Sequence, residues 1–148
     1  MLASAFGPSS IAVTSERLNW QGALTKAIGL LVLDGRVQSG YLDDVLSANE
    51  RLGPYFVIAP QIAIAHAAPS ENVIETGFAL LKLESPVASG SVNDPVKLLF
   101  SFSAIDADSH LDLLSQFAQV MSEPGKVNLL LNDSNPDTLR GHLLDSVG

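Results

Sequence analysis

Cysteine is absent from this chain of 148 residues. The chain therefore cannot form disulfide bonds, use a thiolate as a nucleophile or build a cysteine-based zinc or iron–sulfur site. Any covalent chemistry must use histidine, serine, aspartate or glutamate side chains. The sequence contains only 3 histidines, so their positions are the first place to look for chemistry.

Long apolar runs are also absent. No stretch reaches the ~20 consecutive apolar residues that span a bilayer, and residues 1–10 lack the basic start and long apolar core of a signal peptide. We therefore expect a cytoplasmic protein with no direct insertion into a membrane.

Basic residues are scarce. The 8 Lys and Arg residues are scattered among 16 Asp and Glu residues, and the formal net charge is -8. Binding to nucleic acid needs clustered basic side chains, so this class of function is excluded. A basic protein surface is a better partner for this charge.

The hydrophobic content is 47%. At this length it supplies one core of ordinary size, while two ordinary domains would need a longer chain. We therefore expect a single domain over residues 1–148.

Helical periodicity and capping residues predict five helices. One begins after Asn19 and ends at Gly35, one begins after Ser39 and ends before Gly53, and the others run from Asp108 to about Ser122, from Lys126 to Leu131, and from Asn135-Pro136 to about Val147.

Apolar runs bounded by turn residues predict strands. These runs are Ile11–Val13, Tyr55–Ile58, Ile62–Ile64, Thr76–Leu83 and Val96–Ser103. The runs on either side of Pro60 fit two strands or one interrupted strand. The residues before Ile11 are expected to be irregular, Ser85-Pro86 to interrupt the pattern, and residues 67–75 to form a surface loop. Helices at both ends with strands between them predict an α/β layer architecture.

His66 closes the apolar run 61–65 and precedes Ala67-Ala68-Pro69. An imidazole attacks phosphorus only when it is neutral, with one ring nitrogen free and the other N–H held by an acceptor. The end of a strand supplies that rigidity, and small neighbours let a partner protein approach the ring. His66 is thus a candidate phosphoryl carrier, although a half-buried structural histidine fits the same local pattern.

His110 follows Asp106-Ala107-Asp108-Ser109. With Asp108 as the N-cap, His110 would lie in the first helical turn, where free backbone N–H groups and the helix dipole favour an anion. A second imidazole there could neutralise an incoming phosphate. An ordinary surface residue of a first turn is the competing interpretation, and His142 has no comparable setting.

A metal site is the alternative for the same region. The plausible ligands for zinc or manganese are His66, His110, Asp106, Asp108 and Asp112. There is no His-Glu-x-x-His motif, and aspartates gather at helix starts for capping reasons. A serine hydrolase and a nucleotide-binding loop are weaker still, because the glycine-rich motifs of both are missing.

Five ordered blocks resemble a known family. They are GPYFVIAP (53–60), IAIAHAAP (62–69), TGFAL (76–80), NDPV (93–96) and DADSH (106–110). Together they resemble the IIA component of the sugar phosphotransferase system, within the mannitol/fructose superfamily, and are most similar to the ascorbate-type IIA proteins. The resemblance extends from about Asn19 to the last predicted helix.

The resemblance implies a mixed β-sheet flanked by helices and a phosphoryl relay. His66 would accept phosphate from the phosphohistidine of HPr and pass it to a cysteine of a IIB protein or domain, for uptake of an ascorbate-like sugar through a IIC membrane transporter. His110 matches the second active-site histidine of the family. Transfer between two side chains mainly needs positioning and charge neutralisation, so no metal and no cofactor are expected.

Further candidate contacts to the phosphoryl group or to partner proteins are Arg51, Tyr55, Glu71 and Glu75. We expect a backbone carbonyl, or a carboxylate such as Glu71 or Glu75, to hold the second N–H of His66. The mannitol and fructose branches carry an arginine one position before Arg51.

Three residues depart from the usual pattern of the family. Gln61 replaces a glycine, Ala65 replaces a proline, and Ala68 stands where ascorbate-type members often have arginine. A regulatory IIA-like domain, whose phosphorylation controls another protein and does not feed transport, is the alternative interpretation of the whole chain.

Overall fold

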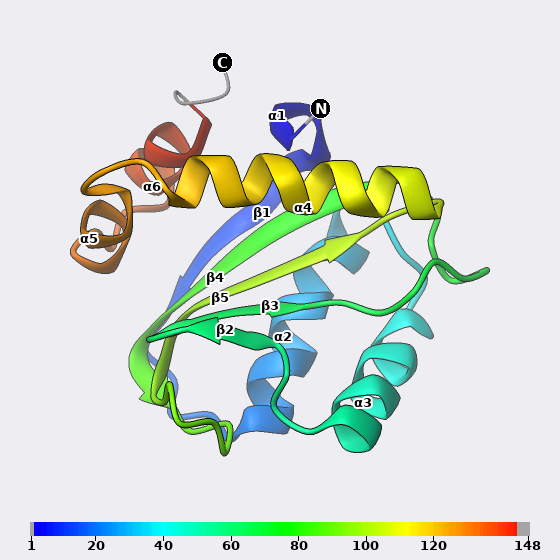
Figure 1. Ribbon diagram of the computed structural model, residues 1–148, viewed down its shortest axis with the longest axis horizontal. Coiled ribbons are helices and arrows are strands. Elements are labelled where there is room, and N and C mark those ends of the chain that lie inside the picture. Colours follow the sequence, from blue (N-terminus) through cyan, green and yellow to red (C-terminus); the bar gives the residue numbers. More distant parts are fainter. Residues whose placement is uncertain (1, 145–148) are drawn as a thin grey trace.

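The structure is a computed structural model that describes residues 2–144. A twisted five-stranded sheet, in the order β1-β4-β5-β3-β2, has helices on both faces (Figure 1). The elements are α1 (Leu2–Ala5), β1 (Phe6–Thr14), α2 (Trp20–Leu33), α3 (Tyr41–Leu52), β2 (Val57–Ala59), β3 (Ile62–Ala65), β4 (Gly77–Val87), β5 (Val96–Ser103), α4 (Ala107–Met121), α5 (Lys126–Leu131) and α6 (Pro136–Leu144).

The sheet is mixed, as the resemblance implied. β1 pairs with β4 in parallel and β3 pairs with β5 in parallel, while β4–β5 and β2–β3 are antiparallel. In the parallel register Ala65 lies opposite Ser101. The carboxyl ends of β3 and β5 therefore emerge at the same edge of the sheet, and this edge positions the candidate site.

Each face of the sheet packs against its own helical layer. Successive residues of β3 point to opposite faces, so Ile62 and Ile64 belong to one hydrophobic cluster and Ala63 and Ala65 to the other. The first cluster includes α4 to α6, and the second includes α2 and α3, which cover the opposite face in Figure 1. Burial on both faces explains why the strand sequences are nearly continuous apolar runs.

Local capping signals predicted several helix ends correctly. The Asn19 side chain accepts from the Gly22 N–H at 2.7 Å, and the Asn135 side chain accepts from the Asp137 N–H at 2.8 Å. Gly35, just beyond α2, has φ of 69°, a conformation that glycine adopts without steric cost. The short helix at Lys126–Leu131 is also confirmed. Val147, the predicted end of the last helix, lies outside the described residues.

The start of the chain differs from the expectation. Residues expected to be irregular form α1 and the first part of β1, with a shift of register between Phe6 and Ile11. The Ser9 N–H and the Ser10 hydroxyl both donate to the carboxylate of Asp34, at 2.9 and 2.8 Å. This contact comes from the end of α2, so no local pattern could reveal it.

Two further boundaries were wrong. The N-cap of α3 is Gly40, and no side chain caps this helix, so Ser39 does not serve as predicted. β4 continues through Ser85-Pro86 to Val87, which lies opposite Val96 after a shift of register.

Within the described residues 2–144, no helix has the length and apolar content to cross a membrane.

Candidate functional site

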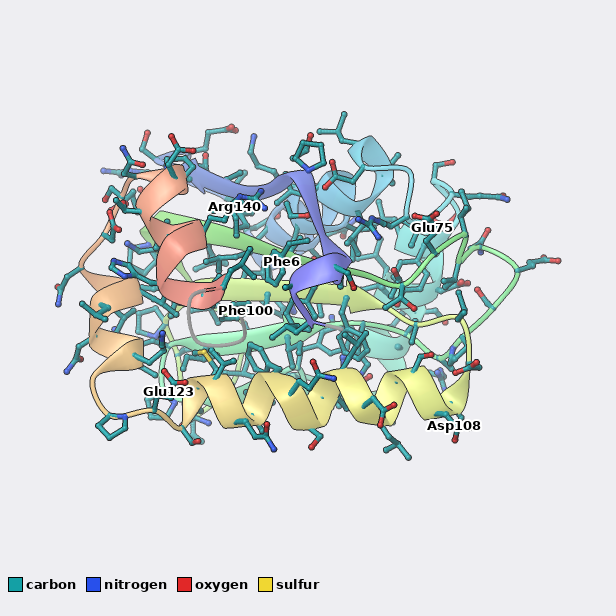
Figure 2. All side chains as sticks on the ribbon, turned by 90° about the horizontal axis from the view of Figure 1, so that it is seen from above. Phe6, Glu75, Phe100, Asp108, Glu123 and Arg140 are labelled. Carbon is teal, nitrogen blue, oxygen red and sulfur yellow. The ribbon has the colours of Figure 1, made fainter. Side chains whose placement is uncertain are left out.

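Two histidines meet at the edge where β3 and β5 end. His66 follows β3 directly, and His110 lies in α4, which crosses the sheet face with its first turn at this edge (Figure 1). The ring centroids are 5.3 Å apart and the rings are nearly perpendicular, at 69°. Figure 2 shows Asp108, at the start of α4, and Glu75 at the same end of the molecule, with Glu123 at the other. The structure therefore brings together the two histidines that the sequence singled out.

The orientation of the His66 ring is fixed by its own backbone. The Nδ1 atom lies 2.9 Å from the carbonyl oxygen of Ile64. A carbonyl only accepts hydrogen bonds, so this contact requires the proton on Nδ1. The lone pair is then on Nε2, and the neutral ring presents one nucleophilic nitrogen.

This contact identifies which of the predicted acceptors binds the second N–H of His66. The backbone carbonyl of Ile64 orients His66, and neither Glu71 nor Glu75 does. The Glu75 carboxylate lies 3.5 Å from the Arg36 guanidinium. Glu71 is an exposed residue of the loop between β3 and β4.

Aromatic rings surround His66. Phe102 stacks on it with ring centroids 4.7 Å apart, and Phe56 and Tyr55 follow at 5.6 and 5.8 Å. Phe56 and Phe102 are buried, whereas Tyr55 is 40% exposed. The aromatic ring of Phe102 also lies 4.9 Å from the His110 ring. One buried side chain thus contacts both imidazoles and limits how far either ring can turn.

The electrostatic setting keeps both imidazoles neutral. Burial lowers the pKa of His66, a hydrogen bond to Ile64 opposes this effect, and the nearby His110 lowers the pKa further. Burial also lowers the pKa of His110. Because the ordinary pKa of histidine is close to 6.5, both rings are mainly uncharged near neutral pH. A neutral ring is the nucleophilic form.

Asp108 was predicted as the N-cap of α4, but the N-cap is Asp106. Asp106 has extended backbone angles and its side chain accepts from the Ser109 N–H at 2.8 Å. Asp108 is already helical and stands in the first turn. The His110 N–H therefore donates to the Asp106 carbonyl at 3.1 Å, so the imidazole, and not the backbone N–H, is what His110 offers to an anion.

Arg51 stands in the last turn of α3, beside a surface pocket of about 270 Å³. The pocket is lined by α3 and by the loop after His66, through Asp44, Ser47, Ala48, Arg51, Ala67, Ala68, Pro69 and Ser70. The charge of Arg51 also acts on the Tyr55 hydroxyl, where it opposes the rise in pKa that burial causes. Arg51 and Tyr55 thus form a rim, in which Tyr55 lies beside the His66 ring.

Two residues that contact the site were missed by sequence reasoning: Phe102, which stacks on His66, and Tyr41, whose hydroxyl accepts from the Ala67 N–H. Phe102 is an unremarkable apolar position in a buried strand, and Tyr41 reads as part of the apolar stripe of a helix. The signal for Phe102 was available only through strand pairing, because Ser101 lies opposite Ala65 and the following residues are neighbours.

Among residues 2–144, no three His, Asp or Glu side chains lie close enough to share a metal ion.

Comparison with known proteins identifies the family of this chain. A profile of the family described as "Phosphoenolpyruvate-dependent sugar phosphotransferase system, EIIA 2" matches residues 4–145. The chain is 38% identical over 132 residues to the "Ascorbate-specific PTS system EIIA component" of Shigella boydii serotype 4 (strain Sb227), covering 88% of this chain and 80% of that protein.

Solved structures show the same fold. The solution structure of the mannitol-specific cryptic phosphotransferase enzyme IIA CmtB from Escherichia coli superposes with a TM-score of 0.88 and 30% identity, covering 100% of both chains. The complex of enzyme IIAMTL and phosphorylated enzyme IIBMTL from Escherichia coli gives a TM-score of 0.80 and 19% identity, covering 95% of this chain and 99% of that chain.

The match to the family profile spans nearly all described residues, and the resemblance seen in the sequence blocks is confirmed. This chain belongs to the EIIA 2 family and is a phosphotransferase component of a phosphoenolpyruvate-dependent sugar phosphotransferase system.

Proposed function

We propose that Nε2 of His66 accepts a phosphoryl group from the phosphohistidine of HPr and passes it to a cysteine of a IIB protein or domain. In the first step the P–N bond of HPr breaks and a P–Nε2 bond forms. In the second step that bond breaks and a P–S bond forms on IIB. The Nδ1 proton of His66 stays on the ring throughout.

The observation that carries the proposal is the contact between His66 Nδ1 and the Ile64 carbonyl at 2.9 Å. It selects the tautomer in which Nε2 is free, and burial lowers the pKa so that this nitrogen is unprotonated near neutral pH. A ring held in one orientation also favours in-line attack, since little rotational freedom must be lost in the transition state.

His110 is proposed to stabilise the transferring phosphoryl group. Its ring centroid lies 5.3 Å from that of His66, and this short separation supports a role in which a His110 N–H would donate to oxygens of a phosphoryl group on Nε2. The incoming negative charge would raise the low pKa of His110, so the ring would take up a proton and neutralise part of that charge.

Arg51 and Tyr55 are proposed as contacts to the phosphoryl group or to partner proteins. Ala68 supplies no basic side chain where ascorbate-type relatives often have arginine, and Arg51 lines the same pocket as Ala68. A guanidinium at this rim can serve the same electrostatic purpose from α3. The exposed Glu71 and Glu75 would act only at the edge of a docking surface, for example toward a basic patch of HPr.

The sugar is proposed to be ascorbate-like, because several relatives at 36–38% identity are named as ascorbate-specific components. The proposal of a IIB partner draws on a structural neighbour that was solved in complex with phosphorylated enzyme IIB. A IIC membrane transporter would be reached only through IIB.

The test is incubation with phosphoenolpyruvate, enzyme I and HPr, followed by peptide mass spectrometry under non-acidic conditions. We expect one acid-labile phosphoryl group on His66 and none on a His66→Ala variant. Full acceptance by that variant would refute the assignment.

A second experiment distinguishes the relay from the regulatory alternative. The phosphorylated protein is mixed with an ascorbate-type IIB, and phosphocysteine is measured. Transfer supports the relay. Stable phosphorylation of His66 without transfer to IIB would support a regulatory role.

A further inference from the structure

Tyr41 connects the two strand ends that carry the site. It is the first residue of α3 and its side chain is 0% exposed. The hydroxyl accepts from the Ala67 N–H at 3.0 Å and donates to the Phe102 carbonyl at 2.9 Å, with the Ala67 carbonyl at 3.2 Å. Ala67 follows His66, and the Phe102 ring stacks on His66.

The hydroxyl takes the place of a sheet hydrogen bond. Ala65 lies opposite Ser101 in the parallel β3–β5 ladder, which ends at this pair. If the ladder continued, the next bond would run from the Ala67 N–H to the Phe102 carbonyl. Tyr41 inserts its hydroxyl between these same two groups, so they stay connected while the strand ends are held apart.

The insertion comes from the face opposite the imidazole. Tyr41 belongs to the hydrophobic cluster of α2 and α3, whereas Phe102 belongs to the cluster of α4. Burial raises the pKa of the Tyr41 phenol far above its ordinary value, so the hydroxyl keeps its proton and remains a donor. The backbone beneath His66 is therefore supported from α3, while the ring itself stacks on the other face.

We infer that Tyr41 is a positioning residue for the phosphoryl-transfer reaction. It sets the separation of the β3 and β5 ends, and through it the alignment of His66 with Phe102 and His110. This inference rests on the proposed function for its kinetic consequence and on the contacts alone for its structural one. Tyr41 is fully buried, so it acts through His66 and touches no partner protein.

The variant is Tyr41→Phe, which removes only the hydroxyl. The Ala67 N–H and the Phe102 carbonyl then either lose their partner or pair directly, and both outcomes move His66. We expect kcat for transfer from phospho-HPr to fall about tenfold or more, since small misplacements of reacting groups are costly. KM for phospho-HPr should stay within about twofold, because binding is unaffected.

The matched control is Ser10→Ala. Ser10 is also 0% exposed, and its hydroxyl likewise accepts a backbone N–H, that of Gly7, and donates to an oxygen, on Asp34. It lies in β1, which β4 and β5 separate from β3 in the sheet. We expect it to lower stability while leaving transfer unchanged. Equal losses of kcat in both variants would reduce the effect of Tyr41 to general stability and overturn the inference.

Two readouts do not depend on activity. The ¹⁵N chemical shifts of the His66 imidazole should show the Nδ1–H tautomer in the wild type and a mixture of tautomers in Tyr41→Phe. The Ala67 amide of the wild type should be protected from hydrogen exchange, and this measurement holds even if the variant fails to fold. Exchange as fast as that of an exposed loop amide, or unchanged imidazole shifts and kcat in Tyr41→Phe, would overturn the inference.

A wild type that accepts no phosphoryl group would overturn the proposed function and not the role of Tyr41. In that case the imidazole shifts and the Ala67 exchange would still confirm or overturn the positioning of His66.

Discussion

The aromatic ring of Phe102 stacks on the imidazole of His66, with ring centroids 4.7 Å apart and an interplanar angle of 26°. The same ring meets the His110 imidazole edge-on, at 4.9 Å and 70°. Because Phe102 is fully buried in β5, one ring of the core contacts both histidines and limits their rotation.

Phe102→Leu should slow phosphoryl transfer beyond what its loss of stability explains. The substitution removes buried ring atoms and leaves a cavity, which should lower the free energy of unfolding by roughly 1–2 kcal/mol, and it also removes the flat surface that both imidazoles contact. Urea denaturation and the rate of phosphoryl acceptance measure the two effects. Phe100→Leu is the control, because Phe100 is equally buried and contacts Phe117 and not a histidine. Equal transfer rates in the two variants would contradict this role of Phe102.

Protonation of His66 should begin at lower pH than in a peptide. Its pKa is lowered mainly by burial, so the midpoint of its NMR titration should fall below 6.5. Acceptance of phosphate should therefore persist as pH drops from 7 toward 6.5. A midpoint at or above 6.5 would argue against the buried, carbonyl-bonded ring.

The same shift has a consequence for stability. Because the folded pKa of His66 and of His110 is depressed, the unfolded chain binds more protons in the window between the folded pKa and 6.5. The contribution of these two histidines to the free energy of unfolding should thus be constant above that window and should fall as pH decreases through it. Urea denaturation across this range should show a shallower dependence for a His66→Gln variant than for the wild type. An identical dependence would assign the effect to other groups.

Gln61→Gly should stabilise the protein. Gln61 has φ of 69°, and a residue with a side chain pays roughly 1–2 kcal/mol in this left-handed region. Glycine relieves that cost but loses more conformational entropy on folding, so the net gain should be about 1 kcal/mol or less. Gly35 has the same φ of 69°, and Gly35→Ala should therefore destabilise the protein. Urea midpoints of both variants test the pair, and a loss of stability in Gln61→Gly would show that the Gln61 side chain makes a compensating contact.

Asp106→Ala should weaken α4 more than Asp108→Ala does. Only Asp106 accepts a backbone N–H at the helix start, and this contact with Ser109 also lowers the pKa of its carboxyl group. The urea midpoint should fall more for Asp106→Ala, and the His110 imidazole resonances should broaden. The reverse order of the two midpoints would restore Asp108 as the cap.

Local signals in the sequence were sufficient where one segment determines its own conformation. The cap at Asn135 followed by Pro136, and the end of α2 near Gly35, are examples, because each depends on residues a few positions apart. The α/β class was predictable for a similar reason, since strand and helix periodicities differ.

Features that depend on distant segments could not be predicted from local patterns. The irregular-looking start of β1 is held by Asp34, and the choice of Asp106 over Asp108 as cap depends on the backbone angle with which the chain leaves β5. The two histidines were identified from their local settings, but their separation follows from the strand pairing and from where α4 crosses the sheet. The contacts of Tyr41 are invisible in the sequence for the same reason.

The hydrogen bond from His66 Nδ1 to the Ile64 carbonyl also has a kinetic consequence for the proposed relay. With Nδ1 engaged, the ring has one usable nitrogen, and phosphate must arrive and depart through the same opening. The donor and acceptor proteins would therefore bind to the same surface, and only one of them could be bound at a time. A carrier of this design would follow ping-pong kinetics, and an excess of either unphosphorylated partner would slow the flux by occupying the site.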